Sequence, residues 1–445
     1  MFIAISNEPR DYAWGSRTAI AELLGRAPSG GPEAELWFGA HPGSPSRILE
    51  PGKTGGATTL DAWIEAEPLV ALGAGRSGLP FLLKLLAADR ALSLQAHPNA
   101  EQARAGFERE NAAGLAVDAP GRNYKDPFPK PELVLALSET FEALVGFRHV
   151  SESRLLLAEL SAFATGADRA AITRFNEQLQ AGADPAAAGA TGSALDVGRY
   201  GAPSTPETTP ADADGDANPL HQAVSWILAG GAEIEELVSA ITTAATAAGT
   251  GSSFSREWQT VATLAEQYPG DSGIAISLLL NHVSLRQGQA MYLSAGSIHA
   301  YLSGVGVEIM GASDNVLRGG LTEKHIDVAE LLDTVAFTSL PAPIVQTDSP
   351  VDGVVAFRGD TEEFVLAQVT LGEAGYDHGY QLSGPAEATF GLTGPAIAFV
   401  LTGGVGVRGQ HDRASLGRGD AVYITPDEDA LTFTGSGLVF VATTP

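Results

Sequence analysis

Two histidines of this 445-residue chain lie in segments whose composition suits a metal site. His97 follows Gln95 by two positions in segment 92–98, so alternation along a strand would place both side chains on one face. An amide oxygen and an imidazole could then face a single ion. His299 follows an apolar run and a turn of small residues at 294–297. For either histidine alone, a buried or turn residue without a ligand is at least as common an explanation.

Two further segments gather polar groups of several kinds. Segment 123–132 is rich in proline and charge, and it ends in Lys130 and Glu132. Its simplest interpretation is a surface loop, but the apolar run that follows favours an enclosed Glu132. Segment 308–324 is rich in glycine, and a solvated loop is again the alternative. It contains Glu308, Asp314, Asn315, Arg318 and Lys324.

The charge balance restricts what the chain can bind. The sequence has 53 acidic and 26 basic residues and a formal net charge of −27, which repels nucleic acid and anionic membranes. A phosphorylated substrate would be repelled as well, so an enzyme for such a substrate needs a local cluster of lysines and arginines. The chain has no cysteine, which excludes disulfides and thiolate metal sites. Any transition metal must therefore use imidazole, carboxylate or amide ligands.

The chain shows no pattern typical of export or membrane insertion. Residues 1–8 lack the basic start and apolar core of a signal peptide, and no run approaches 18 apolar residues. We therefore expect a cytoplasmic protein without nucleic-acid or membrane partners, and we expect a monomer.

The chain that must position these side chains divides into three regions with different predicted secondary structure. Apolar runs at 79–86 and 133–137 predict buried strands, and 99–114 predicts a helix. Residues 151–268 have the apolar spacing of helices, interrupted by a low-complexity stretch at 181–218 that we expect to be a flexible loop. From about 335 onward, short strands alternate with turns, which is typical of an antiparallel barrel or sandwich. These strands are expected at 364–371, 396–401, 421–424 and 438–443.

Taken together, the polar segments resemble those of type I phosphomannose isomerases, a zinc-dependent family of bicupin proteins. The family's LS-Q-x-HP, KPE, PAG-x-x-HAY-x-x-G and SDN-V-x-R-x-GLT-x-K segments appear here in order, at 92–98, 130–132, 294–304 and 313–324. Segments 12–15 and 34–42 also look like the family's N-terminal segments. The chain departs from the family pattern at Pro129, Ser294 and Glu323, none of which is an expected metal ligand.

The resemblance implies one Zn²⁺ per chain, held by Gln95, His97, Glu132 and His299. It also implies a mainly β fold with an α-helical insertion, built from two cupin (jelly-roll-like) barrels and a helical domain. We assign residues 1–150 with 269–334 to the catalytic barrel and residues 151–268 to the helical domain. Residues 335–445 are expected to form a cupin-like barrel without metal, in which His378 and His411 are surface residues.

The implied reaction interconverts mannose 6-phosphate and fructose 6-phosphate through an enediol. It needs a base beside the carbon and positive charge at the developing enediolate oxygen. We expect Arg318 to stabilise the enediolate. The candidates for proton transfer, besides a metal-bound water, are Lys130, Glu308, Asp314 and Tyr301. The candidates for binding the phosphate are Ser93, Lys84, Lys130 and Lys324.

Two alternatives remain open at this point. The chain could be a non-catalytic cupin that senses a sugar phosphate as a regulator, although a pure binder needs no enediolate stabiliser such as Arg318. It could also be an isomerase whose main substrate is another aldose phosphate.

Overall fold

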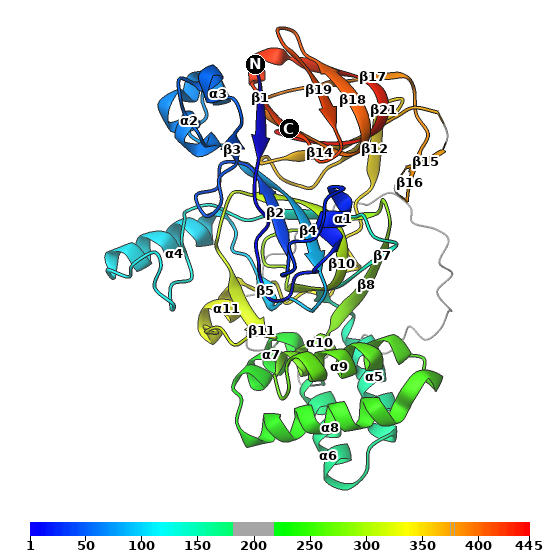
Figure 1. The fold of residues 1–445 in the computed structure, drawn as a ribbon. Helices are drawn as coiled ribbons and strands as arrows, with labels where there is room; N and C mark the ends of the chain where they lie inside the picture. Colours follow the sequence, from blue (N-terminus) through cyan, green and yellow to red (C-terminus); the bar gives the residue numbers. More distant parts are fainter. Residues whose placement is uncertain (181–217, 374, 378) are drawn as a thin grey trace.

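The structure is a computed structural model that describes residues 1–180, 218–373, 375–377 and 379–445. Its helices and strands are arranged in three tiers (Figure 1). A helical bundle lies at one end, a sheet curls through the middle, and a second sheet lies at the other end beside both chain termini. The prediction of a mainly β chain with an α-helical insertion is confirmed. The predicted loop at 181–218 lies outside the described residues, except for Asn218 at its end.

The middle tier, called here the central sheet, has nine strands joined by antiparallel pairings. Its longest strand, β10, pairs with β4, β5, β6 and β7 and so joins most of the tier. The apolar runs predicted as buried strands are β4 and β6, in which every residue is buried. The strands are β2 (Glu35–Phe38), β4 (Phe81–Ala88), β5 (Leu94–Ala96), β6 (Glu132–Ala136), β7 (Thr140–Phe147), β8 (Leu280–Arg286), β9 (Ala290–Leu293), β10 (His299–Gly311) and β11 (Leu317–Gly320).

The second tier, called here the C-terminal sheet, has ten strands. Its long pair, β18 and β21, forms the middle of the strand order. The strands are β1 (Phe2–Ser6), β3 (Arg47–Ile48), β12 (Thr347–Val351), β13 (Val354–Phe357), β14 (Val365–Leu371), β17 (Glu387–Gly391), β18 (Ala396–Arg408), β19 (Arg413–Gly417), β20 (Ala421–Ile424) and β21 (Ala430–Thr443). A separate hairpin consists of β15 (Gly375–Asp377) and β16 (Tyr380–Leu382).

The start of the chain differs from the domain assignment made on the sequence. Residues 1–150 were assigned as one block to the catalytic barrel, but β1 pairs with β20 of the C-terminal sheet, and β3 pairs with β1. The physical reason is that β20 has a free edge beyond its pairing with β18, and the apolar strand β1 covers it. The other domain boundaries remain predictions.

The helical tier is built from amphipathic helices whose apolar stripes face one another. One core cluster contains Leu157, Leu237 and Trp258 from these helices together with Leu94 and Leu317 of the central sheet, so the bundle packs directly on that sheet. The helices are α5 (Val150–Ala162), α6 (Gly166–Gln178), α7 (Pro219–Leu228), α8 (Ala232–Ala248), α9 (Ser255–Gln267) and α10 (Gly273–Ser277). No helix among the described residues has the length and apolar character needed to cross a membrane.

Shorter helices surround the two sheets. The predicted helix at 99–114 is α4, which begins with a capping box in which Asn99 and Gln102 bond to each other's backbone N–H groups. The others are α1 (Ala19–Leu23), α2 (Leu60–Ala66), α3 (Pro68–Leu72) and α11 (Val328–Thr334), with 3₁₀ turns η1 (Pro51–Thr54), η4 (Gly249–Gly251) and η5 (Pro426–Glu428).

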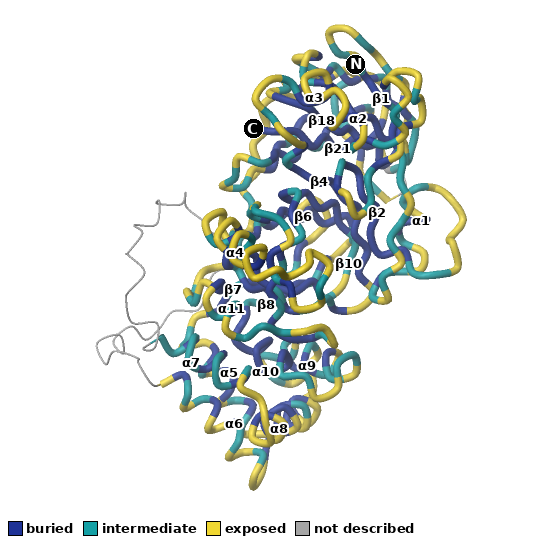
Figure 2. The backbone as a smooth tube through the Cα atoms, turned by 90° about the vertical axis from the view of Figure 1, so that its left-hand side faces the viewer, coloured by how far each residue is buried: buried dark blue, intermediate teal, exposed yellow. Residues whose placement is uncertain are grey.

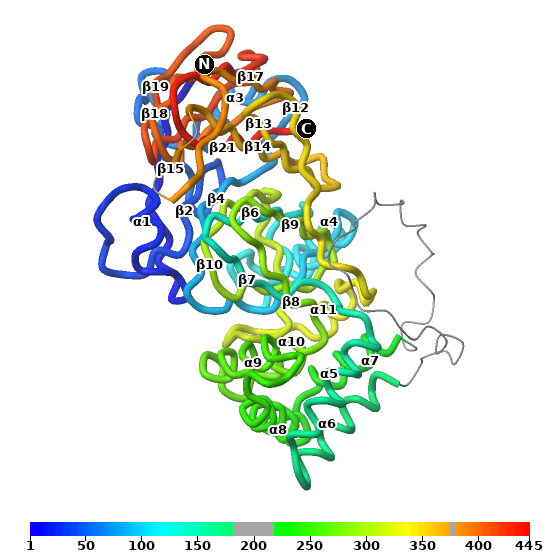
Figure 3. The backbone as a smooth tube through the Cα atoms, turned by 90° about the vertical axis from the view of Figure 1, so that its right-hand side faces the viewer, coloured from blue at the N-terminus to red at the C-terminus, as the bar shows by residue number. Residues whose placement is uncertain are grey.

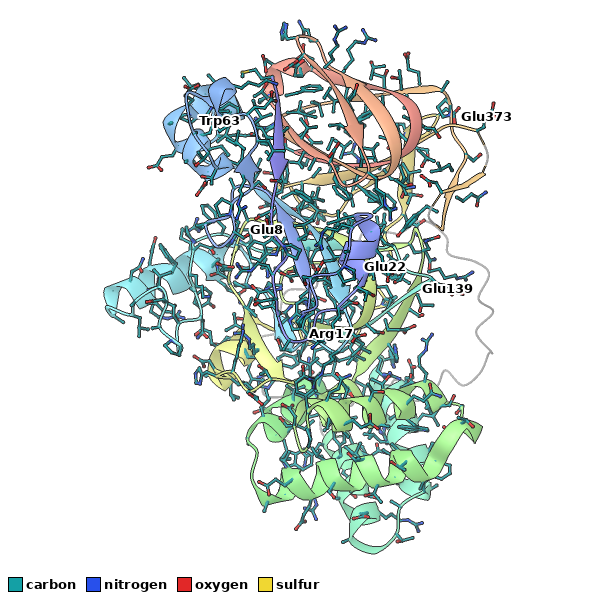
Figure 4. All side chains as sticks on the ribbon, in the orientation of Figure 1. Glu8, Arg17, Glu22, Trp63, Glu139 and Glu373 are labelled. Carbon is teal, nitrogen blue, oxygen red and sulfur yellow. The ribbon has the colours of Figure 1, made fainter. Side chains whose placement is uncertain are left out.

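The buried residues run as a continuous band from the bundle through both sheets (Figure 2). Between the sheets, Phe38 packs against Phe399 with ring centroids 5.2 Å apart. Trp63 of α2, labelled in Figure 4, packs edge-on against Tyr423 of β20. The chain after α11 runs beside β9 toward the C-terminal sheet (Figure 3), and the Val345 N–H donates to the Ala290 carbonyl there. These contacts fasten the two sheets together.

Candidate functional site

The central sheet brings distant segments together through its strand register. Strand β5 lies between β10 and β11, and Gln95 is the register partner of both His299 and Arg318. His97 follows the end of β5, where its carbonyl accepts a hydrogen bond from the Gly296 N–H. Glu132 is the first residue of β6 and pairs in register with Met310 of β10. These pairings bring the four predicted ligands together from strands at both edges of β10.

The side chains of three of these residues form a compact cluster. Glu132 Oε1 lies 3.3 Å from His97 Nε2, and Glu132 Oε2 lies 3.3 Å from His299 Nε2. One ligand atom from each residue can be chosen so that all three lie within 4.8 Å of one another. The Gln95 carboxamide nitrogen lies 3.2 Å from His299 Nε2, so the amide borders the same point. All three clustered residues are buried.

The hydrogen bonds behind the two imidazoles determine which nitrogens face the cluster. His97 Nδ1 lies 2.8 Å from the Asn315 carbonyl oxygen, and His299 Nδ1 lies 2.9 Å from the Ser297 carbonyl oxygen. A carbonyl only accepts, so in a neutral ring Nδ1 carries the proton and Nε2 presents a lone pair. This backbone-anchored arrangement is typical of histidines that bind metal ions.

The electrostatics of the cluster favour a cation. Burial is the main reason that the pKa of His97 falls to about 4, so this ring is neutral near pH 7. Burial alone would raise the pKa of Glu132, but its neighbours, foremost the Lys130 ammonium, outweigh burial and hold that pKa well below its usual range. Lone pairs of the imidazoles therefore face an ionised carboxylate. Among the described residues, His97 Nε2 and Glu132 Oε2 are buried atoms without a hydrogen-bond partner.

These observations fit the expected metal. Two imidazoles, a carboxylate and an amide oxygen are suitable ligands for zinc, and orphaned buried acceptors call for an ion or a proton between them. Within the described part of the chain, the His97–Glu132–His299 group is the one histidine and carboxylate cluster compact enough to hold an ion.

A second buried network lies behind the cluster on β4, β10 and β2. Lys84 Nζ lies 3.2 Å from Glu308 Oε2 and 3.9 Å from Glu35 Oε1. Tyr301 donates its hydroxyl to Glu308 Oε1 at 2.9 Å, and Trp37 donates its indole N–H to Glu35 Oε2 at 2.7 Å. Lys84 was expected to bind phosphate, but the structure encloses its ammonium between two carboxylates and over the Trp37 ring. This environment suits an ion-pair network and not a solvent-facing anion site.

The pKa shifts in this network follow from burial and charge count. Burial by itself lowers the pKa of Lys84, but Glu35, Glu308 and Glu132 outweigh it and raise that pKa above its usual value. Burial raises the pKa of Glu308, with Lys84 opposing the rise and Glu132 and Glu35 adding to it. Burial, reinforced by Glu308, also raises the pKa of Tyr301 well above its usual value. Tyr301 is therefore a neutral donor, and Glu308 is the carboxyl group most ready to hold a proton.

A cluster of cations lies on the other side of β5. Within the described residues, the Arg318 guanidinium has no hydrogen-bond or ion-pair partner, and burial lowers its pKa. The pKa of Lys324 is lowered by burial and then by the positive charges of Arg318 and Lys125. Lys324 is thus repelled by two further cations in a strongly acidic protein, as a phosphate site would require. Ser93 is half-buried and directly precedes β5.

Asp314 belongs to a more rigid part of the site. Its Oδ1 lies 3.4 Å from His41 Nε2. Burial would raise its pKa, but the hydrogen bond and charge of His41 outweigh this and lower the pKa to about 2. The neighbouring Asn315 accepts the Lys125 N–H at 2.7 Å and donates to the Asp126 carbonyl at 2.8 Å, so it ties segment 125–128 to segment 313–315.

Four residues of the site were not predicted as functional. Glu35 and Trp37 lie two positions apart in β2, and the same alternation rule that paired Gln95 with His97 would have paired them. His41 and Lys125 lie in irregular segments, where strand alternation does not apply, although His41 belongs to the family-like segment 34–42 and Lys125 to the polar segment 123–132.

Comparison with known proteins agrees with this geometry. The family model for the catalytic domain of type I phosphomannose isomerase matches residues 2–150. Mannose-6-phosphate isomerase of Escherichia coli strain K12 is 36% identical over 437 residues, covering 97% of this chain and 96% of that protein. The Rattus norvegicus enzyme of the same name is 32% identical over 361 residues, covering 77% of this chain and 76% of that protein.

Solved structures extend the agreement to the fold. A zinc-bound crystal structure of mannose 6-phosphate isomerase superposes with a TM-score of 0.78 at 33% identity, covering 100% of this chain and 99% of that chain. The apo structure from Salmonella typhimurium gives the same values. The resemblance predicted from the sequence motifs is confirmed, and the chain belongs to the type I mannose-6-phosphate isomerase family.

Proposed function

We propose that this protein interconverts mannose 6-phosphate and fructose 6-phosphate, with one zinc ion held by Gln95, His97, Glu132 and His299. The observation that carries the proposal is the buried donor set, in which two imidazoles and an ionised carboxylate face one another with two acceptor atoms unpartnered. The zinc-bound relative, whose chain aligns over the full length, supports the choice of metal.

A bound zinc ion would act as a Lewis acid that polarises the oxygens on C1 and C2 of the open-chain sugar. The protein's own contribution is to hold the ligands in place before the ion binds. The backbone carbonyls of Asn315 and Ser297 keep the Nε2 atoms of the two histidines aimed at the cluster. Lys130, whose ammonium lies 3.1 Å from Glu132 Oε1, keeps that carboxylate ionised.

Arg318 is proposed to stabilise the enediolate. Its register partner is Gln95, so the guanidinium projects from a strand adjacent to the ligand strand. It is half-buried and, within the described residues, has no ion-pair partner, so its charge is available to an oxyanion. A fixed positive charge in a site that partly excludes water stabilises the transition state, because negative charge develops there on the oxygen.

Glu308 is proposed as the proton-transfer group. Efficient proton transfer near neutral pH needs a pKa raised from that of an ordinary carboxyl, and burial produces such a shift here. Tyr301 and Lys84 hold the two oxygens of Glu308 at 2.9 and 3.2 Å, which fixes the orientation of the carboxyl group. Asp314 is less suited because its pKa is lowered to about 2.

The phosphate is proposed to bind at Lys324 and Lys125, beside Arg318, with Ser93 as a hydroxyl donor. The support is the repulsion of Lys324 by the Arg318 and Lys125 charges, which a dianion would relieve. Lys84 is left out of this assignment because two buried carboxylates already neutralise it.

The first experiment is direct conversion. Zinc-loaded protein incubated with mannose 6-phosphate should yield fructose 6-phosphate, and a chelator should stop the reaction until zinc is restored. Comparing turnover with several aldose phosphates separates this substrate from another main substrate. Tight binding of mannose 6-phosphate without turnover would overturn the proposal in favour of the regulatory alternative.

Two substitutions test the assigned roles. Arg318→Ala should lower kcat by roughly 10²–10³-fold, as expected for removal of a preorganised donor, and Glu308→Gln should lower it by roughly 10²–10⁴-fold. Both variants should retain one zinc per chain. Arg286→Ala and Glu139→Gln are matched controls, because both residues are exposed, the latter as labelled in Figure 4. A variant with unchanged kcat would remove that residue from the mechanism.

A further inference from the structure

The turn that follows Arg318 has a backbone conformation that few residues adopt. Leu321 has φ of 52°, in the left-handed region, and is one of two such non-glycine residues in the described part of the chain. The turn connects β11, which carries Arg318, to Lys324. Residues in this region usually persist only when their surroundings hold them there, and they cluster at functional sites. The surroundings of Leu321 therefore bear on how the two cations are placed.

A single carboxylate from another tier holds this turn. Asp271 Oδ1 accepts the Leu321 N–H at 2.8 Å, and its Oδ2 accepts the Thr322 N–H at 3.2 Å. The same Oδ1 accepts the Gly273 N–H at 2.7 Å, which orients the carboxylate. Asp271 lies between α9 and α10, in the part of the chain that leads from the helical bundle back to the central sheet.

The approach of the two segments is close enough to require glycine on both sides. A Cβ on Gly320 would lie 2.7 Å from the Gly273 Cα and 3.0 Å from Asp271 Oδ1. A Cβ on Gly273 would lie 2.8 Å from Asp271 Oδ1 and 2.9 Å from the Leu321 nitrogen. Real Cβ atoms are not found so close to other atoms, so neither glycine can be replaced without moving the backbone. The Leu321 side chain, only 1% exposed, is anchored in the helical core.

We propose that Asp271 is a positioning residue for the sugar-phosphate site, acting through the backbone at residues 320–322 to place Arg318 and Lys324. The inference rests on the proposed function, which gives those two cations their role. Asp271 lies outside every segment that carries the family motifs. On this proposal, the bundle is part of the machinery that binds substrate, because it supplies the carboxylate that shapes the turn.

The test compares Asp271→Ala with Asp412→Ala as a matched control. Asp412 also accepts backbone N–H groups, from Phe2 at 2.9 Å and Arg413 at 2.8 Å, but it lies in the connection between β18 and β19 of the C-terminal sheet. Asp271→Ala should raise the KM for mannose 6-phosphate and the inhibition constant for inorganic phosphate by roughly tenfold each, the loss expected when one or two charge-assisted hydrogen bonds no longer hold the site. Zinc content should stay at the wild-type value. Asp412→Ala should change neither constant.

A conservative variant and a double variant separate positioning from general stability. Asp271→Asn retains an oxygen for Leu321 and Gly273 but presents an amide group to the Thr322 N–H, so its KM should be intermediate. If Asp271 acts through Lys324, Asp271→Ala should raise KM by much less in a Lys324→Ala background than in wild type. If Asp271→Ala does not fold, the intermediate KM of Asp271→Asn carries the test.

Three results would overturn the inference: unchanged constants in both Asp271 variants, equal effects of Asp271→Ala and Asp412→Ala, or fully multiplicative effects of Asp271→Ala and Lys324→Ala. Wild-type protein without isomerase activity would defeat the proposed function instead. In that case the dissociation constant of inorganic phosphate, measured by calorimetry, is compared between the variants in place of KM. Weaker phosphate binding by the Asp271 variants still supports positioning, and unchanged binding rejects it.

Discussion

The central sheet and the C-terminal sheet are both antiparallel, but they enclose different chemistry. The interior of the central sheet contains Lys84, Glu132, His299 and Glu308, all of them buried. The core of the C-terminal sheet is made of residues such as Val400, Phe433 and Val441. Alternation along the strands works identically in both tiers, so the fold does not decide which one becomes a site.

The difference shows what a charged interior requires. Burying an ionised group costs several kcal/mol unless it is paired, and in the central sheet each buried cation faces a carboxylate. The apolar cluster between the sheets contains Phe38 and Phe399, and it supplies burial that the ionisable residues cannot. The central sheet is therefore organised for chemistry, and the apolar cores around it supply the folding stability.

The largest effect is expected from removing a metal ligand. His299→Ala should abolish zinc retention and lower kcat/KM by at least roughly a thousandfold, because the donor set loses an imidazole. His411→Ala, an exposed histidine in the C-terminal sheet tier, is the control and should alter neither value. Metal analysis of dialysed protein and an isomerase assay measure both. A His299→Ala protein that keeps one zinc per chain would remove this residue from the site.

The next effect is expected from breaking the buried ion pairs. Lys84→Met leaves Glu35 and Glu308 without their shared cation, and the free energy of unfolding should fall by roughly 3–5 kcal/mol. Adding Glu35→Gln should recover part of this loss, because one buried charge disappears. Urea unfolding of the single and double variants gives the comparison. If the two substitutions destabilise additively, the three side chains do not form one network.

A smaller effect is expected from the apolar tier. Val441→Ala removes two buried methyl groups from the C-terminal core and should lower the free energy of unfolding by about 1.5–3 kcal/mol. Zinc content and KM should remain at wild-type values, because this core does not touch the site. Urea unfolding and steady-state kinetics test both halves. A changed KM would show that the two tiers are energetically coupled.

The smallest effect concerns Asp314 and pH. Its folded pKa of about 2 lies below the ordinary value of 3.8, so its contribution to stability is complete above about pH 4 and is lost as the pH falls toward 2. Replacing His41 with alanine should bring the folded pKa back toward 3.8. The free energy of unfolding should then depend less steeply on pH between 2 and 4 than in wild type. Urea titrations at several pH values in this window measure the slope, and an unchanged slope would contradict the role given to His41.

The sequence predicted the elements better than it predicted their partners. The apolar runs at 79–86 and 133–137 identified β4 and β6. Alternation predicted that Gln95 and His97 act together, and Gln95 Nε2 lies 3.2 Å from His299 Nε2 while His97 Nε2 lies 3.3 Å from Glu132 Oε1. Glu132 and His299 were assigned by family resemblance, because their meeting depends on the register of β6 and β5 against β10. Local patterns carry no information about such long-range register.

The phosphate-binding prediction for Lys84 rests on the same missing information. A lysine in an apolar strand has no partner visible in the sequence, and a free ammonium suggests an anion site. Its partners, Glu35 and Glu308, come from strands that lie about 50 and 220 residues away and are known only once the sheet is assembled. Asp271 illustrates the same limit, since its role depends on a turn that meets it in space from another tier.

The pairing of β1 with β20 has a consequence for how the protein is made. On the ribosome, the strand at residues 2–6 emerges about 415 residues before its partner at 421–424. Closing a loop of this size is slow, so the apolar β1 strand must wait, unpaired, until β20 has been synthesised. Nascent chains with unpaired strand edges are prone to aggregate, so this first strand is where we expect chaperones to protect the growing protein.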